Sequence, residues 1–299
     1  MKILVTGAGG FLGGALCRAL AGEGHDVLGL DVAIPPVGIG YRQAQCDLLT
    51  VDLTEILQEE APYWVIHCAG NANVGLSVQD PFMDLNSSYV LLHRLLYAVK
   101  AVREETKVLF LSSAAVYGNP ERLPIAEGDR RHPVSPYGLH KAACEDLCGY
   151  FTRIEGIDCR VMRIFSAYGA GLRKQILWDL CTKIEKPGKI ALFGTGAETR
   201  DFIHVDDVVR AAGLIMFKGE SGIYNVANGA EVRIDAVVKA LLRVADISEQ
   251  RLSFSGEQKP GDPLNWRADT SRLNALGYVQ SVPLDVGIKG YFEWRRQLD

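Results

Sequence analysis

Apolar residues in the first half of the chain follow two alternating patterns. Short, nearly continuous apolar runs predict buried strands, and longer stretches with apolar residues at every third or fourth position predict helices. The predicted strands are 2–6, 25–30, 43–46, 63–68, 107–111 and 158–164, and the predicted helices are 12–21, 50–60, 86–102 and 135–154. Strands that alternate with helices indicate an α/β fold with a doubly wound parallel Rossmann-type sheet, whose ligands bind at the carboxyl ends of the strands.

The alternation becomes less regular after about Ser166. Gly, Pro and basic residues become frequent there, and the predicted strands at 189–193 and 222–226 are short. We therefore expect residues 1–165 to form a nucleotide-binding domain. Residues 166–299 are expected to form mainly a smaller α/β lid that binds the substrate, with some segments returning to the first domain.

A glycine-rich turn separates the first predicted strand from the first predicted helix. It contains Gly7, Gly10 and Gly13, and Asp31 ends the second predicted strand. Gly7 permits a tight turn, Gly10 leaves room for a pyrophosphate at the helix start, and Gly13 lets helix and strand pack closely. This unit predicts a dinucleotide site. An acid at position 31 bonds ribose hydroxyls and repels a 2′-phosphate, so the pattern favours NAD over NADP.

A candidate proton-transfer pair lies in the predicted helix 135–154. Tyr137 and Lys141 are four residues apart, so a helix places them on one face, one turn apart. An ammonium beside a phenol favours the phenolate, which can take a proton from an alcohol and later return it. Ser113 follows the predicted strand 107–111 and is the candidate hydroxyl partner of this pair.

Composition and charge narrow the classes of function. The formal net charge is -4 and both signs are dispersed, which argues against nucleic-acid and membrane-surface partners. The sequence contains no apolar run of about eighteen residues, as a membrane span needs. Glycines begin at position 7, too early for a signal peptide. The seven cysteines and six histidines show no metal-binding spacing, so we expect reduced thiols, no metal and a cytoplasmic location.

Four motifs occur in order along nearly the whole chain. They are Thr6-Gly-Ala-Gly-Gly-Phe-Leu-Gly13, Ser112-Ser-Ala-Ala-Val-Tyr-Gly118, Ser135-Pro-Tyr-Gly-Leu-His-Lys141 and Thr199-Arg-Asp-Phe-Ile-His-Val-Asp-Asp207. Together they resemble the extended short-chain dehydrogenase/reductase family. Within that family they are similar to the NAD-dependent nucleotide-sugar epimerases and dehydratases, a group that includes the UDP-glucose 4-epimerases.

The resemblance implies roles for the residues at matching positions. The catalytic residues would be Ser113, Tyr137 and Lys141. The cofactor NAD would be bound by Gly7, Gly10, Phe11, Leu12, Gly13, Asp31, Asp47, Leu48, Cys68, Ala69, Gly70, Ser112, Tyr137 and Lys141. The substrate, a nucleotide-diphosphate sugar with UDP-hexose favoured, would be bound by Ser113, Tyr137, Ser166, Arg200, Lys259, Asp262 and Trp266.

The residues after Ser113 distinguish among the reactions of the family. Its dehydratases and decarboxylases carry acidic residues there, whereas this chain has Ala114 and Ala115, which cannot transfer a proton. This difference favours a 4-epimerase, which oxidises the sugar at C4 to a ketone and returns the hydride to the opposite face. A 4-ketoreductase or 4-dehydrogenase of deoxysugars uses the same trio with exchangeable cofactor. An NAD-sensing binding module is a third hypothesis, and it needs no such trio.

Two departures from the family pattern lie on the substrate side. Ser166 stands where the family commonly has Asn, and the segment 170–179 is unlike the usual epimerase loop; its Arg173 and Lys174 either contact phosphates or face solvent. Lys259 also stands where the family usually has Arg. They leave the identity of the sugar open. Trp266 occupies the position that closes the sugar pocket, and its bulk favours a plain hexose over a 2-acetamido sugar.

The resemblance also implies a homodimer. The helices 86–102 and 135–154 match the pair that forms a four-helix bundle between subunits in the family. Val90, Leu91 and Leu95 fit an apolar stripe for this contact. The alternative is that the stripe packs on the sheet of its own subunit, since both arrangements need the same periodicity.

Overall fold

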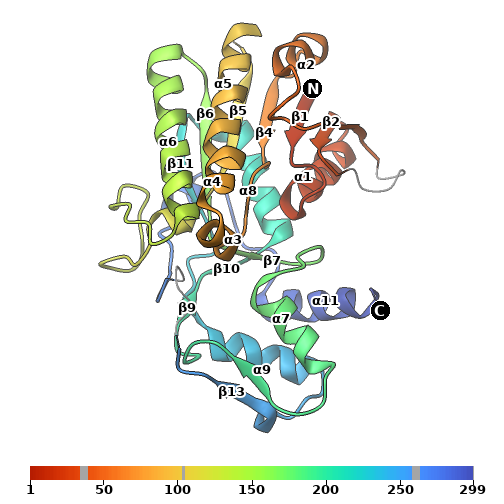
Figure 1. The fold of residues 1–299 in the computed structure, drawn as a ribbon, viewed down its shortest axis with the longest axis vertical. Coiled ribbons are helices and arrows are strands. Elements are labelled where there is room, and N and C mark those ends of the chain that lie inside the picture. The colour runs from red at the N-terminus through yellow and green to blue at the C-terminus, as the bar shows by residue number, and fades with distance from the viewer. Residues whose placement is uncertain (34–39, 103–104, 258–262, 299) are drawn as a thin grey trace.

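A seven-stranded parallel sheet forms the upper half of the molecule in Figure 1. The computed structural model describes residues 1–33, 40–102, 105–257 and 263–298. The strands follow the order β11-β6-β5-β4-β1-β2-β3. Their bounds are β1 Lys2–Thr6, β2 Asp26–Asp31, β3 Arg42–Gln45, β4 Trp64–His67, β5 Lys107–Ser113, β6 Cys159–Ile164 and β11 Gly222–Val226. The prediction of a doubly wound parallel sheet is confirmed.

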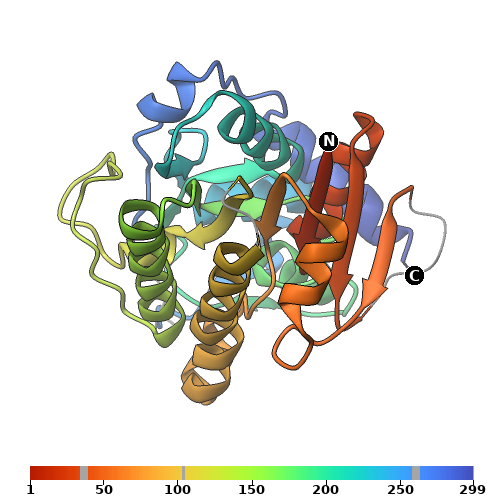
Figure 2. The same cartoon turned by 90° about the horizontal axis from the view of Figure 1, so that it is seen from above.

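Helices cover both faces of this sheet (Figure 2). One face packs against α1 (Phe11–Gly22) and α8 (Val205–Lys218), and the other against α2 (Leu53–Glu60), α5 (Leu91–Val102) and α6 (Pro136–Glu155). Successive strand residues point to opposite faces. Accordingly Ile3 and Val5 lie in the core beside α1 and α8, whereas Leu4 lies in the core beside α5. Burial on both faces explains the continuous apolar runs in the sequence.

The connection between β4 and α5 differs from the prediction. A single helix was expected over 86–102, but residues Asn86–Val90 form a π-helical turn, η1, and α5 begins at Leu91. Two short helices, α3 (Val74–Gln79) and α4 (Pro81–Leu85), precede that turn. Asn73 and Asp80 cap these helices through their side chains, so polar residues form structure here without an apolar periodicity.

The second half of the chain builds the lower part of the molecule around its own apolar core. Its helices are α7 (Gln175–Ile184), α9 (Ile234–Val244) and α11 (Leu284–Arg296). Short strands pair as β7 (Ser166–Tyr168) with β10 (Phe202–His204), β8 (Ile190–Leu192) with β13 (Leu252–Phe254), and β9 (Thr199–Arg200) with β12 (Val232–Arg233). Three segments of this half, α8, β11 and α10 (Ser271–Ala275), belong instead to the layers of the large sheet.

Three features bear on the classes considered from composition. None of the helices in the described ranges is long and apolar enough to cross a membrane. All seven cysteines are free thiols. Over the same ranges, no group of three His, Cys, Asp or Glu side chains could hold a metal ion.

Candidate active site

The glycine turn lies between the ends of β1 and β4. Gly7 has φ +73°, a conformation that favours glycine, and a Cβ there would lie 2.6 Å from the backbone nitrogen of Ala69. A Cβ at Gly13 would lie 2.1 Å from the Gly7 carbonyl oxygen. A side chain at Gly7 or Gly13 would push these backbone segments apart. The glycines therefore permit the close packing of β1, α1 and the residues Cys68 and Ala69 that follow β4. The assignment of these residues to the cofactor site remains a prediction.

The outer side of the turn is open where α1 begins. An added Cβ at Gly10 would meet only the Gly7 carbonyl oxygen, at 3.2 Å, among the described atoms within 4 Å. Gly10 is the N-cap residue of α1, and Phe11 and Leu12 occupy the first turn of the helix. The backbone N–H groups of a first helical turn attract anions. This turn therefore fits the pyrophosphate of a dinucleotide.

Asp31 lies at the end of β2, beside the glycine turn. Its carboxylate accepts hydrogen bonds from the backbone N–H of Gly9 at 2.9 Å and of Ala33 at 3.1 Å. The acid is thus fixed next to the pyrophosphate position, where a ribose would follow. This arrangement fits NAD and disfavours a 2′-phosphate.

Asp47 and Leu48 follow β3 on the same side of the sheet. Asp47 is exposed and accepts a hydrogen bond from the backbone N–H of Leu49, whereas Leu48 is buried in the core. The two residues follow the strand next to β2, on the side where the adenine of the dinucleotide is expected. Their contact with the base remains a prediction.

Tyr137 and Lys141 lie one turn apart at the start of α6. The Lys141 ammonium donates to the carbonyl oxygen of Leu111 at 2.8 Å and lies 5.9 Å from the centroid of the Tyr137 ring. It also lies 4.7 Å from the centroid of the Phe110 ring. Lys141 is buried, so its position is set by β5 as well as by its own helix. The spacing in the sequence correctly predicted that this pair shares one face.

The first turn of α6 packs closely on the segment after Ser113. Ser135 caps the helix by accepting from the Gly138 N–H at 3.2 Å. A Cβ at Gly138 would lie 2.5 Å from the Ala115 carbonyl oxygen, so glycine permits this approach. Ser113 caps the short 3₁₀ turn Ala114–Val116 through the N–H of Ala115. The structure thereby brings Ser113 and the Tyr137 pair to the same edge of the sheet.

The side chain of Ser112 has a different environment from that of Ser113. Its hydroxyl donates to Glu145 at 2.6 Å inside the protein, on the face covered by α6. The Glu145 carboxylate also pairs with the Arg163 guanidinium, which in turn donates to the Tyr117 hydroxyl at 2.7 Å. The Ser112 side chain therefore belongs to a buried polar network, and its contact with the cofactor remains a prediction.

Several positioning residues were not found from the sequence. Glu145 lies one helical turn after Lys141, but its partners lie on β5 and β6. The hydroxyl of Ser77 accepts a hydrogen bond from the Tyr137 backbone N–H at 3.1 Å. His140 contacts the buried carboxylate of Asp84 at 2.5 Å. Only the i, i+4 spacing from Lys141 to Glu145 offered a sequence signal.

The second half of the chain contributes residues beside the end of β6. Trp266 is buried, and its indole N–H donates to the Gly118 carbonyl oxygen at 3.0 Å. Its ring contacts that of Phe165, with centroids 5.8 Å apart. The Arg200 guanidinium lies 5.5 Å from the centroid of the Trp266 ring. Trp266 and Arg200 are therefore brought together next to the segment that follows Ser113.

A buried carboxylate holds this part of the site in place. Asp201 accepts backbone hydrogen bonds from Ala268 at 3.0 Å and Asn228 at 3.0 Å. Burial raises the pKa of Asp201 to about 6, against the lowering effect of these hydrogen bonds. Ser166 joins the same region, since its backbone N–H donates to the Asp201 carbonyl oxygen at 3.0 Å. Lys259 and Asp262 lie outside the described residues.

Three comparisons relate the chain to known proteins. The family described as the NAD dependent epimerase/dehydratase family matches residues 3–227. The chain is 30% identical to a UDP-glucose 4-epimerase of Mycolicibacterium smegmatis, over 99% of both proteins. The structure of UDP-glucose 4-epimerase from Thermotoga maritima with UDP-glucose superposes with a TM-score of 0.92 at 27% identity, over 100% of both chains. That of UDP-glucuronic acid 4-epimerase from Bacillus cereus, with UDP-glucuronic acid and NAD, superposes with a TM-score of 0.92 at 26% identity, also over 100% of both chains.

Proposed function

The chain belongs to the NAD-dependent epimerase/dehydratase family, and we propose that it is an NAD-dependent 4-epimerase of a UDP-hexose. One observation carries the proposal. Tyr137 and Lys141 share a face of α6 beside Ser113, and the turn after Ser113 consists of Ala114, Ala115 and Val116. Epimerisation at C4 needs one proton-transfer residue and a hydride acceptor. Hydrocarbon side chains after Ser113 supply no second acid or base for dehydration.

Tyr137 is the acid and base of the proposed reaction. Its phenolate takes the proton of the sugar 4-hydroxyl as C4 is oxidised, and the phenol returns that proton to the ketone oxygen when C4 is reduced again. The Lys141 ammonium stabilises the phenolate by its charge. The Ser113 hydroxyl donates a hydrogen bond to the C4 oxygen, where negative charge develops during reduction.

The cofactor is NAD, held at the glycine turn by Gly7, Gly10, Gly13 and the backbone of the first turn of α1. The Asp31 carboxylate accepts hydrogen bonds from the adenosine ribose hydroxyls. When bound, NAD accepts a hydride from a carbon atom and returns it, so the complete reaction consumes no reductant. Because the 4-keto sugar can present either face of C4, return of the hydride to the second face inverts the configuration.

The substrate side is assigned to residues of the second half. Arg200 carries a guanidinium suited to a phosphate of the UDP group. Trp266 is held by Gly118 and stacks edge-on against Phe165, so its bulk cannot move aside easily. This restraint supports a plain hexose over a sugar with a 2-acetamido group. Ser166, Lys259 and Asp262 complete the proposed substrate site.

A homodimer through α5 and α6 is part of the proposal. These helices lie side by side on the outside of the sheet (Figure 2). Two residues of the apolar stripe identified in the sequence, Leu91 and Leu95, pack in the core of their own subunit and not on its surface. Other apolar side chains on the two helices remain exposed, namely Tyr97, Leu139, Tyr150 and Ile154. A second copy that covers them would remove this surface from water.

The proposal is tested by proton NMR of the purified protein with a panel of nucleotide hexoses, NAD and no reductant. Conversion of one UDP-hexose into its C4 epimer is the expected outcome, and it identifies the sugar. Consumption of NADH with a 4-keto-6-deoxy sugar, without epimerisation of any hexose, would contradict the proposal and select a 4-ketoreductase. A protein inactive with every sugar of both kinds would also contradict it.

A further inference from the structure

A segment from the second half of the chain reaches across to the nucleotide-binding half. Residues 169–175, here called the strap, run from the end of β7 to the first residue of α7. The strap contains three residues with positive φ, Gly169 at 140°, Gly171 at 98° and Gln175 at 65°. A positive φ at Gln175 is unfavourable for a residue with a side chain, so tertiary contacts must impose this path.

The strap is anchored to the lower core. Leu172 is buried there, and its carbonyl oxygen accepts a hydrogen bond from the Tyr291 hydroxyl of α11 at 2.8 Å. Phe11, the first residue of α1, packs against the same core. A Cβ added at Gly171 would contact the Phe11 ring at 3.4 Å. One end of the strap therefore lies beside the residue that follows the glycine turn.

The other end of the strap reaches the loop after β4. The Lys174 ammonium donates to the carbonyl oxygen of Ala72 at 2.6 Å. Ala72 follows closely after Cys68 and Ala69, which lie against the glycine turn. The two contact points of the strap, at Phe11 and Ala72, thus flank the turn at which a pyrophosphate fits.

The electrostatic environment of Lys174 points to an anionic ligand. Burial lowers the pKa of its ammonium. Within the described ranges, no charged group contributes to this shift, and the Ala72 carbonyl uses one of the three N–H donors of Lys174. Lys174 is half-buried, and a cation that is partly removed from water without a counter-charge is destabilised. A diphosphate bound alongside would provide that counter-charge.

We propose that Lys174 is a cofactor-binding residue, and that the strap carries its ammonium to the pyrophosphate of NAD lying over the glycine turn. The proposal rests on the proposed function only for the identity of the cofactor. An ammonium on the pyrophosphate would also slow the release of NAD between turnovers. The strap ties the two halves together across the bound dinucleotide, and an epimerase that returns its hydride has no need to exchange the cofactor.

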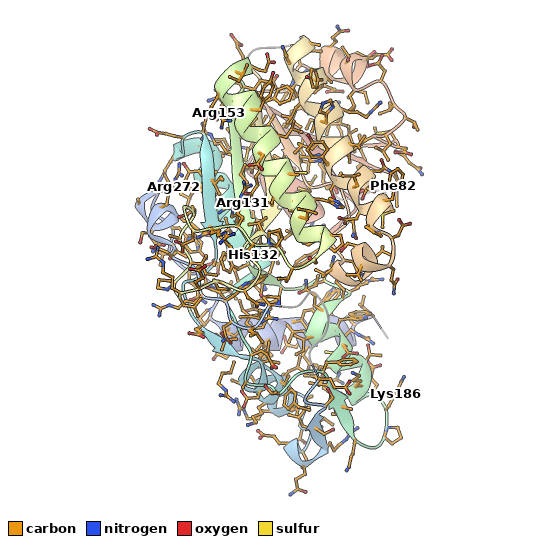
Figure 3. All side chains as sticks on the ribbon, turned by 60° about the vertical axis from the view of Figure 1, so that its left-hand side comes forward. Phe82, Arg131, His132, Arg153, Lys186 and Arg272 are labelled. Carbon is orange, nitrogen blue, oxygen red and sulfur yellow. The ribbon has the colours of Figure 1, made fainter. Side chains whose placement is uncertain are left out.

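The test separates the charge of Lys174 from its hydrogen bond to Ala72. Lys174→Gln keeps a donor for the Ala72 carbonyl and removes the charge, whereas Lys174→Arg keeps the charge. The matched control is Lys186→Gln, because Lys186 is an exposed lysine that projects from the lower half of the molecule (Figure 3). NAD and UDP affinities are measured by calorimetry on protein freed of cofactor, at two salt concentrations.

We expect Lys174→Gln to weaken NAD binding about tenfold or more, which corresponds to about 1.4 kcal/mol. Its NAD affinity should also depend less on salt, while Lys174→Arg and Lys186→Gln remain within about threefold of the unmodified protein. UDP affinity should be unchanged in all variants. Unaltered NAD affinity in Lys174→Gln would overturn the proposal, because the residue would then be only a tie between the halves.

Two further outcomes are decisive. Loss of UDP affinity with NAD affinity retained would assign the charge to the substrate diphosphate and overturn the proposal. If the unmodified protein binds NAD in a Lys174-dependent way but epimerises no sugar, the proposed function fails and this inference stands. Equal thermal unfolding midpoints of the cofactor-free Lys174→Gln and Lys186→Gln proteins exclude a folding defect as the cause.

Discussion

Glu145 on α6 and Arg163 on β6 form an ion pair at 2.7 Å, and both side chains are at most 2% exposed. The pair is extended on either side by hydrogen bonds to the Ser112 hydroxyl and the Tyr117 hydroxyl. The network therefore fixes α6 to the central strands just beyond Lys141. Because α6 carries Tyr137 and Lys141, the geometry of the proposed proton transfer depends on a buried ion pair outside the proposed catalytic trio.

The first prediction concerns the stability contributed by this pair. Glu145→Gln should lower the free energy of unfolding by about 3–5 kcal/mol, because the Arg163 charge stays buried without its counter-charge. The control is Asp146→Asn, which removes an exposed carboxylate paired with Arg131 and should cost less than about 1 kcal/mol. Urea unfolding monitored by circular dichroism measures both. Equal losses in the two variants would contradict the prediction.

Removal of the Tyr137 hydroxyl should stop the reaction while NAD stays bound to the protein. Tyr137→Phe should lower kcat at least about a hundredfold, because the 4-hydroxyl proton then has no acceptor. NAD content after purification should be unchanged, as should the fold. Tyr150→Phe is the matched control on the same helix, since its exposed hydroxyl contacts only Glu155 among the described partners. Turnover of both variants is measured by NMR. An active Tyr137→Phe enzyme would refute the assignment of Tyr137 as the acid and base.

Cofactor preference should change with the charge at the end of β2. Asp31→Asn keeps a side-chain oxygen for the Gly9 N–H but removes the negative charge near the ribose. The ratio of NAD to NADP affinity should fall about tenfold or more, since repulsion of the 2′-phosphate is lost. Asp26→Asn, at the opposite end of the same strand, makes the same charge change away from the site. A preference unaltered by Asp31→Asn would remove this residue from the ribose site.

The buried His67 should make stability depend on pH. Burial, followed by the nearby charge of Lys141, lowers the pKa of His67 from 6.5 to about 3. Between these values the unfolded chain binds the extra proton, so stability is complete above pH 6.5 and falls by about 1.4 kcal/mol per unit as pH decreases below it.

His67→Phe should remove this contribution and leave a flatter profile. The substitution retains the stacking of an aromatic ring against Phe110, where the two ring centroids are 6.0 Å apart. Urea unfolding at several pH values between 5 and 7 gives the two slopes. If the slopes of the variant and the unmodified protein coincide, His67 does not titrate as its burial requires.

The proposed dimer is tested at the exposed end of α6. Ile154 is 65% exposed, and Ile154→Lys would place a charge in the contact with a second copy. Analytical ultracentrifugation should give twice the mass of one chain for the unmodified protein and a shift toward one chain for the variant. Val279→Lys, at a 68% exposed site outside α5 and α6, should leave the mass unchanged. An unmodified protein that sediments as a single chain would contradict the dimer.

The parts of the fold that were predictable depend on local patterns. The strand before Gly7, the helix after Gly10 and the acid at the end of β2 are encoded within about thirty residues, and the sheet strands are continuous apolar runs. The pair Tyr137 and Lys141 was predictable for the same reason, because helical periodicity alone places both on one face.

What could not be predicted depends on contacts between distant segments. Glu145 and Arg163 belong to different elements, so neither residue type indicates the other as its partner. The sequence leaves Lys174 either at a phosphate or in solvent, and its partial burial follows only from the path of the strap. The π-helical turn Asn86–Val90 carries no signal either, since its polar residues fit a regular helix equally well.

The place of β11 in the sheet has a consequence for synthesis of the protein on the ribosome. Residues Gly222–Val226 pair with β6 and complete one edge of the sheet. Until residue 226 has left the ribosome, the backbone N–H and carbonyl groups along that side of β6 have no strand partner. An uncovered edge of this kind can pair with another chain. The nascent protein therefore depends on its later half to be protected from aggregation, and a transcript truncated after β6 should yield insoluble product.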